Sequence, residues 1–81
     1  MGSRHRPLTC PEVKQILKNL GFSARHRTGT SHEQWVKHEA GRLFKVTVDC
    51  PKSPFSQDLI AFMAKQAGVS KSDFYKALEK K

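Results

Sequence analysis

Four apolar residues near the amino terminus recur at the spacing that places them on one stripe of a helix. The stripe consists of Val13, Ile16, Leu17 and Leu20. Thr9 and Glu12 have the spacing of a capping box, and Pro11 falls in the first turn, where its missing N–H costs no hydrogen bond. Gly21 follows the stripe, as expected of a helix C-cap. The pattern predicts a helix from residue 9 to residue 20.

The next thirty residues change to the alternating pattern of half-buried strands. Phe22 and Ala24 alternate with polar residues in a first strand, and a second strand covers about residues 31–37. The segment 39–42 predicts a hairpin loop, in which Gly41 can adopt a positive φ. A third strand follows before Pro51 ends the run. Its inward positions are Phe44, Val46 and Val48.

Helical periodicity returns in the last third of the chain. A second helix, capped by Ser53 or Ser56, ends at Gly68, and Ser70 can cap a short last helix through Leu78. The apolar side chains of the second helix are Leu59, Ile60, Phe62, Met63 and Ala67. We expect them to cover the same face of the sheet as the first helix.

These elements predict an α+β fold of order α-β-β-β-α with a short terminal helix. The connections suit antiparallel hairpins and are too short for parallel crossovers. Two helices on one face of a three-stranded antiparallel sheet form the arrangement of a double-stranded-RNA-binding domain (dsRBD-like). We assign residues 1–8 to a basic lead, whose Met-Gly-Ser start we give no functional weight, and residues 9–79 to a single domain.

The net charge of the chain limits the classes of ligand that it is expected to bind. The chain has fifteen Lys and Arg residues and seven Asp and Glu residues, which gives a formal net charge of +8 on 81 residues. This excess predicts a polyanionic ligand, with nucleic acid favoured over an anionic membrane surface. The chain contains no apolar run of membrane-spanning length and no signal-peptide pattern at its start, so we expect a cytoplasmic protein that does not enter a membrane.

The cysteines and histidines suggest no metal or other cofactor. Cys10 and Cys50 lie forty residues apart without a CxxC pair, and we expect two reduced thiols. The histidines at 26, 32 and 38 recur every six residues, which is not a metal-binding spacing. The carboxylates, among them Glu33 and Asp49, are scattered along the chain.

The segment 25–32 carries the densest candidate chemistry. Each residue type in it has a use on a phosphodiester: guanidinium groups bind phosphate oxygens, hydroxyls donate to them, and glycine lets the backbone approach. These residues are Arg25, Arg27, Thr28, Gly29, Thr30 and Ser31. His32 follows them and can transfer a proton near neutral pH. Residue type and spacing alone still favour an ordinary surface histidine at this position.

Five segments, in their order and spacing, resemble the HicA (YcfA-like) toxin family over roughly residues 9–78. They are 20–22 (LGF), 29–35 (GTSHEQW), Gly41, 45–48 (KVTV) and 64–70 (AKQAGVS). The resemblance implies a dsRBD-like ribonuclease that cuts messenger RNA and is covered by a HicB-type antitoxin. It also implies that His32, which corresponds to the histidine of the family's Gly-Ser-His turn, is catalytic.

The chain departs from the family at three places, one of which is its turn 29–32 (GTSH), a residue longer than the family's commoner Gly-Ser-His. Glu33 stands where many members have a second histidine, and 49–52 (DCPK) stands where many have Pro-x-His. The second proton-transfer partner therefore stays open between water, Lys52 as a cation, and the substrate. We expect a metal-independent endoribonuclease in which Arg25, Arg27 and Lys37 position phosphate. The alternatives are a non-catalytic RNA-binding module and a domain that binds an acidic protein.

Overall fold

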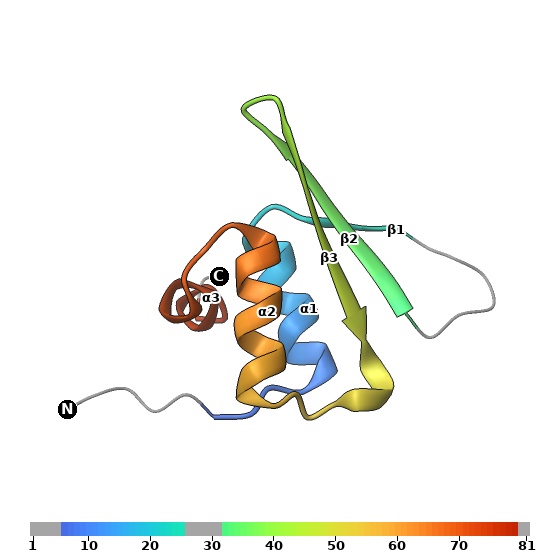
Figure 1. Cartoon of the computed structure of the whole chain (residues 1–81), viewed down its shortest axis with the longest axis vertical. Coiled ribbons are helices and arrows are strands. Elements are labelled where there is room, and N and C mark those ends of the chain that lie inside the picture. Colours follow the sequence, from blue (N-terminus) through green and yellow to red (C-terminus); the bar gives the residue numbers. More distant parts are fainter. Residues whose placement is uncertain (1–5, 26–31, 80–81) are drawn as a thin grey trace.

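The computed structural model describes residues 6–25 and 32–79, and it confirms the α+β fold (Figure 1). The three strands form one antiparallel sheet in the order β1-β2-β3, and the helices lie on one side of it. The elements are α1 (Cys10–Asn19), β1 (Ser23–Arg25), β2 (His32–Glu39), β3 (Arg42–Asp49), a 3-10 helix η1 (Cys50–Lys52), α2 (Gln57–Ala67) and α3 (Lys71–Ala77).

A two-residue turn sets the register of the central hairpin. Ala40 and Gly41 have φ angles of 51° and 76°, both positive, as the tight turns that match strand twist require. The ladder then runs residue by residue from the Glu39–Arg42 pair at the tip to the His32–Asp49 pair at the base. The third strand therefore matches its predicted course, and the second extends two residues beyond its predicted end.

The core lies between the sheet and the helices. Trp35, Val46 and Val48 point inward from the hairpin and are buried, which confirms the predicted alternation for the two valines. They pack with the inward stripes of the helices, which include Val13, Ile16, Leu17, Ile60, Met63, Ala64, Ala67 and Phe74. The capping box of α1 is present, Ser56 rather than Ser53 caps α2, and Ser70 caps α3.

Two apolar side chains expected to face the core do not. Ala24 belongs to β1, a three-residue strand at the edge of the sheet. All three residues of this strand are exposed. Phe62 is 58% exposed because it lies beside the buried stripe of α2 rather than on it. An apolar residue on a helix is buried only if a neighbouring element covers its side, which periodicity does not report.

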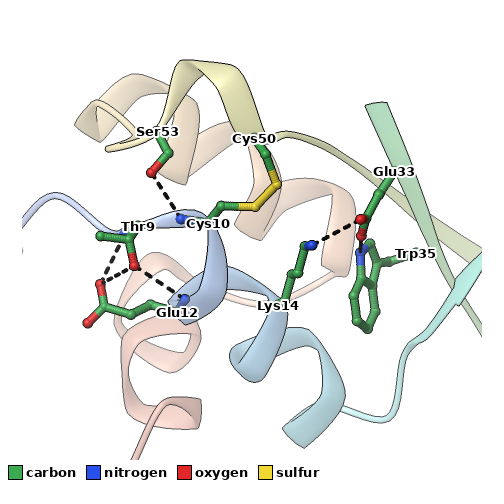
Figure 2. Close-up of a disulfide and its surroundings, with 8 residues drawn as sticks. All are labelled: Thr9, Cys10, Glu12, Lys14, Glu33, Trp35, Cys50 and Ser53. Atoms are coloured by element: carbon green, nitrogen blue, oxygen red, sulfur yellow. Dashed lines mark hydrogen bonds and ion pairs between the residues drawn. A yellow bond between two sulfur atoms is a disulfide. The ribbon is translucent and has the colours of Figure 1, made fainter. Parts of the chain in front are cut away.

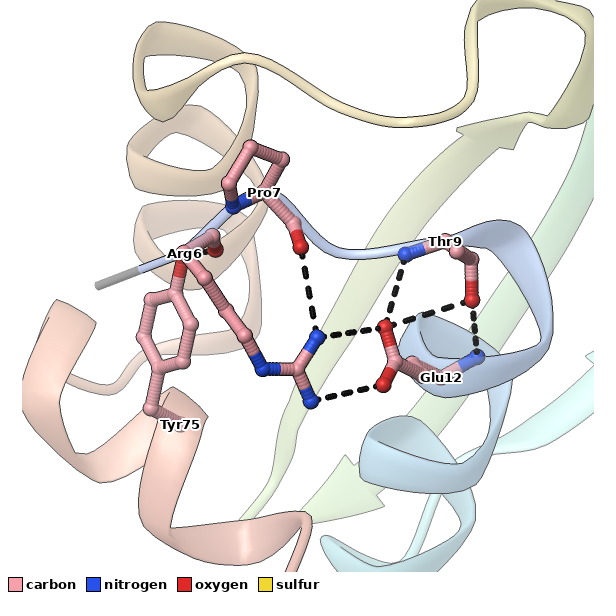
Figure 3. A network of polar contacts seen from close by, with 5 residues as sticks. All are labelled: Arg6, Pro7, Thr9, Glu12 and Tyr75. Carbon is pink, nitrogen blue, oxygen red and sulfur yellow. Dashed lines mark hydrogen bonds and ion pairs between the residues drawn. The ribbon is translucent and has the colours of Figure 1, made fainter. Parts of the chain in front are cut away.

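The amino-terminal segment packs against the domain from Arg6 onward (Figure 3). Leu8, within the expected basic lead, is fully buried and pairs with Phe55, whose N–H donates to the Leu8 carbonyl at 2.8 Å. The Tyr75 hydroxyl of α3 donates to the carbonyl of Arg6. The described part of the lead is therefore tied both to the segment before α2 and to α3.

Cys10 and Cys50 form a disulfide, so the expectation of two reduced thiols is wrong (Figure 2). Their Cα atoms are 5.2 Å apart although forty residues separate them in sequence. The Cys10 N–H also donates to Ser53 Oγ at 3.0 Å. Tertiary packing of the start of α1 against η1 brings the sulfur atoms together, and linear spacing does not reveal such a contact.

Candidate active site

A histidine and an aspartate lie together at the base of the hairpin. His32 begins β2, Asp49 ends β3, and the register places them directly opposite each other. His32 Nε2 is 3.2 Å from Asp49 Oδ2. The side chains are 53% and 22% exposed, so the imidazole stays accessible while the carboxylate is more enclosed. A carboxylate on one ring nitrogen of an imidazole fixes the orientation of the ring.

A lysine completes this group. Lys52 belongs to η1, and its Nζ is 4.0 Å from the same Asp49 Oδ2 that His32 approaches. Its side chain is largely exposed. The three residues bring an imidazole, a carboxylate and an ammonium group together at one end of the sheet, with both cationic or basic groups on the Asp49 carboxylate, and we call them the His32–Asp49–Lys52 cluster.

The backbone on both sides of the cluster is anchored from the opposite face of the sheet (Figure 2). Glu33, next to His32, accepts from Lys14 Nζ at 2.9 Å and from Trp35 Nε1 at 3.2 Å. Cys50, next to Asp49, is bound to Cys10 of α1. Because successive strand residues point to opposite faces, these anchors fix the chain without covering the cluster.

Arg25 lies on the same open face of the sheet as His32. It pairs with Gln34 of β2, which in turn pairs with Thr47 of β3. Gln34 Nε2 donates to Thr47 Oγ1 at 3.1 Å, so the row is tied across two strands. Arg25 is exposed and belongs to β1, the strand next to the β2 strand that carries His32.

Lys37 lies apart from the cluster, on the face of the sheet that packs against the helices. Its Nζ donates to the Leu20 carbonyl at 3.1 Å and is 3.1 Å from Glu39 Oε1. The same nitrogen lies 5.1 Å from the centre of the Phe22 ring, and the side chain is only 18% exposed. These contacts give Lys37 a role in joining the end of α1 to the hairpin.

Arg27, Thr28, Gly29, Thr30 and Ser31 lie outside the described residues. Of the predicted site, the structure brings together His32 and Lys52, with Arg25 on the same face.

A groove of about 210 Å³ opens beside the cluster, between the edge of β3 and α2. His32, Asp49 and Lys52 line one side of it. The other walls are Thr47, Phe55, Leu59, Phe62 and Met63. The candidate site therefore joins a charged group to an apolar hollow.

Asp49 is the site residue that sequence reasoning missed. In the sequence, Asp49 is one of several carboxylates scattered along the chain, and that spacing gives no sign that it lies beside a histidine. The signal lay in the predicted hairpin: counting outward from a two-residue turn at Gly41 pairs Asp49 with His32.

The described residues offer neither a metal site nor a membrane span. Within 6–25 and 32–79, no three His, Cys, Asp or Glu side chains come together in a way that could hold a metal ion. No helix in these ranges is long and apolar enough to cross a membrane.

Comparisons with known proteins identify no relative. No family model matches the chain, and searches of curated proteins and of solved structures find no match either. The functional proposal therefore depends on the geometry at the base of the hairpin together with the sequence resemblance.

Proposed function

We propose that this protein is a HicA-type toxin, a metal-independent endoribonuclease that cleaves messenger RNA with His32. The observation that carries the proposal is the His32–Asp49 pair, 3.2 Å apart, with Lys52 beside the carboxylate on an open face of the sheet. The net charge of +8 supports a nucleic-acid substrate.

The cluster suits cleavage by the RNA's own 2′-hydroxyl. The 2′-oxygen attacks phosphorus and gives up its proton, the bond from phosphorus to the 5′-oxygen breaks, and that oxygen receives a proton. His32 carries out one of these proton transfers, and water or the substrate serves the other. Asp49 orients the imidazole through its contact with Nε2. Lys52 stabilises the charge that develops on the phosphate oxygens.

The proposal extends to substrate positioning, the partner and the location. Arg25 holds a neighbouring phosphate, and the segment 27–31 contributes further phosphate contacts. An antitoxin of the HicB type covers the same face and blocks the cluster. Because the substrate is messenger RNA, the protein acts in the cytoplasm. RNA affinity then falls with salt by a slope of about −0.7 per phosphate contacted on a single strand.

The decisive experiment compares two exposed histidines of β2. His32→Ala and His38→Ala are incubated with labelled messenger RNA in the presence of EDTA. General acid–base catalysis contributes about 10²- to 10⁴-fold, so we expect His32→Ala to lose that much cleavage. His38→Ala should cleave like the parent, because His38 lies opposite Leu43 at the far end of the hairpin.

The outcome separates the enzyme from the second candidate, a non-catalytic RNA-binding module. That candidate is supported by the exposed cations Arg25, Lys45 and Lys52. RNA that is shifted in a gel but stays intact with the parent protein would favour it. Equal cleavage by the parent and His32→Ala would contradict the role of His32.

A further inference from the structure

We propose that the groove beside the His32–Asp49–Lys52 cluster is a subsite for one unpaired nucleobase of the RNA, which stacks on Phe62. The inference deepens the proposed function and rests on it, because it places the reacting phosphate at His32. It names the substrate as single-stranded at this position, and it assigns Phe62 a role in binding rather than in the fold.

The exposure of Phe62 is the first supporting observation. Among the described residues, only Phe62 and Leu43 are large apolar side chains with most of their surface exposed, at 58% and 54%. Leu43 lies near the hairpin tip, whereas Phe62 lines the groove. An aromatic ring facing solvent beside a charged cluster is the arrangement that base-stacking sites on RNA-binding proteins use.

The walls of the groove fit an aromatic ring. Leu59, Met63 and Phe55 supply apolar surface behind Phe62, while Thr47 adds a hydroxyl. Thr47 Oγ1 already accepts from Gln34, so its own O–H is a donor that a base carbonyl can take. The volume of about 210 Å³ is below the roughly 300–1,000 Å³ of sites for drug-sized ligands. The groove therefore suits one ring system rather than a whole larger ligand.

The charged groups beside the groove favour a nucleotide as its occupant. A nucleotide joins a flat ring to an anion, and the groove joins an apolar hollow to the ammonium group of Lys52 and the imidazole of His32. With the base against Phe62, the attached phosphate lies toward the cluster. A double helix keeps its bases stacked inside, so the subsite selects an unpaired base.

The test measures stacking without relying on cleavage. Single-stranded RNA containing one 2-aminopurine is titrated with His32→Ala protein, which keeps the RNA intact, and with the same protein carrying Phe62→Ala, Phe62→Trp or Leu43→Ala. Stacking quenches 2-aminopurine fluorescence. Alanine substitution of stacking residues typically weakens binding about 5- to 100-fold, and we expect that loss and reduced quenching for Phe62→Ala. Phe62→Trp should retain both, and Leu43→Ala should change Kd less than about twofold.

Cleavage kinetics keep the two proposals separable. In protein that retains His32, Phe62→Ala should raise KM by a similar factor and leave its melting temperature unchanged, since the ring is mostly exposed. The subsite would be overturned if Phe62→Ala left RNA affinity and quenching unchanged. It would also be overturned if Phe62→Ala weakened binding to a protein partner but not to RNA. Failure of the parent to cleave RNA would overturn the enzyme, while ring-dependent quenching would still support the subsite.

Discussion

The two ends of the β2–β3 hairpin carry similar residues and differ in what surrounds them. Each end has an exposed histidine, His38 at the tip and His32 at the base, and each lies near an exposed large apolar side chain, Leu43 or Phe62. At the tip, however, His38 lies opposite Leu43, whereas His32 lies opposite Asp49. The base combines a histidine with a carboxylate, a cation and a groove within one cluster of contacts.

Support from the rest of the fold also distinguishes the two ends. The tip projects past the helices (Figure 1), while the base is tied to α1 by the disulfide and by the Lys14–Glu33 ion pair (Figure 2). Catalysis requires groups held in fixed geometry. The comparison shows that residue type alone does not distinguish the two ends of the hairpin. The neighbouring residues and the anchoring of the backbone distinguish the base as the candidate site.

The largest effect on stability should come from removing the covalent anchor of the base. Replacing both Cys10 and Cys50 by serine releases a loop of forty residues in the unfolded chain, which costs about 3–4 kcal/mol by the chain-entropy model. For a domain of this size, we expect the melting temperature to fall by at least about 12 °C. Circular dichroism melts of the parent and the double variant measure the change.

A reducing agent provides the matched control for this prediction. Dithiothreitol should lower the melting temperature of the parent toward that of the double serine variant and leave the variant unaffected. A parent protein whose melting temperature is the same with and without reductant would show that the disulfide does not stabilise the base.

The second prediction compares the carboxylates at the two ends. Asp49→Asn removes the charge beside His32, and Glu39→Gln removes the charge beside Lys37 near the tip. A hydrogen bond to a charged group contributes about 1.5–3 kcal/mol, so Asp49→Asn should lower kcat about 10- to 100-fold. As a positioning residue, Asp49 should leave KM nearly unchanged. Equal kcat values for the two variants would contradict the comparison.

A smaller effect should follow from loosening the support beneath His32. Glu33→Gln weakens the 2.9 Å contact with Lys14, and Lys14→Met removes it. Because both side chains are only partly exposed, we expect a coupling free energy of about 0.5–1 kcal/mol in a double-mutant cycle. Urea denaturation of the parent, both single variants and the double variant measures this coupling. Strictly additive losses would mean that the ion pair does not anchor the strand.

The local features of the fold could be predicted because each depends on a few consecutive residues. Thr9 and Glu12 form the capping box, Gly68 ends α2 with a φ of 80°, and Gly41 lies in the hairpin turn. Local spacing also places Lys37, and it argues against the expectation that this side chain binds phosphate. Side chains two positions apart on a strand share a face, so a buried Trp35 places Lys37 on the helix side.

The base of the hairpin was only partly predictable because it depends on contacts between distant segments. The family resemblance points to His32, and the register of a hairpin with a two-residue turn at Gly41 pairs that histidine with Asp49. The disulfide depends on the packing of the start of α1 against η1, which no periodicity reveals. Phe62 fits a helical stripe, and only the position of β3 shows that the ring faces a groove.

The smallest predicted effect is a pH dependence of the Arg6–Glu12 pair at the start of α1, the helix to which the base of the hairpin is tied (Figure 3). Two hydrogen bonds from the Arg6 guanidinium, at 3.0 and 2.7 Å, and one from the Thr9 N–H hold the pKa of Glu12 at about 2, below its ordinary value of 4.5. A lowered pKa means that the stabilisation is complete above about pH 5 and is lost as the pH falls toward 2.

Glu12→Gln isolates this contribution, because glutamine can keep the capping box while losing the charge. We expect the variant to melt slightly below the parent at pH 7, since exposed ion pairs contribute little. The gap should close between pH 5 and pH 2, where Glu12 of the parent takes up its proton. A gap that persists at pH 2 would show that Glu12 acts through its hydrogen bonds rather than its charge.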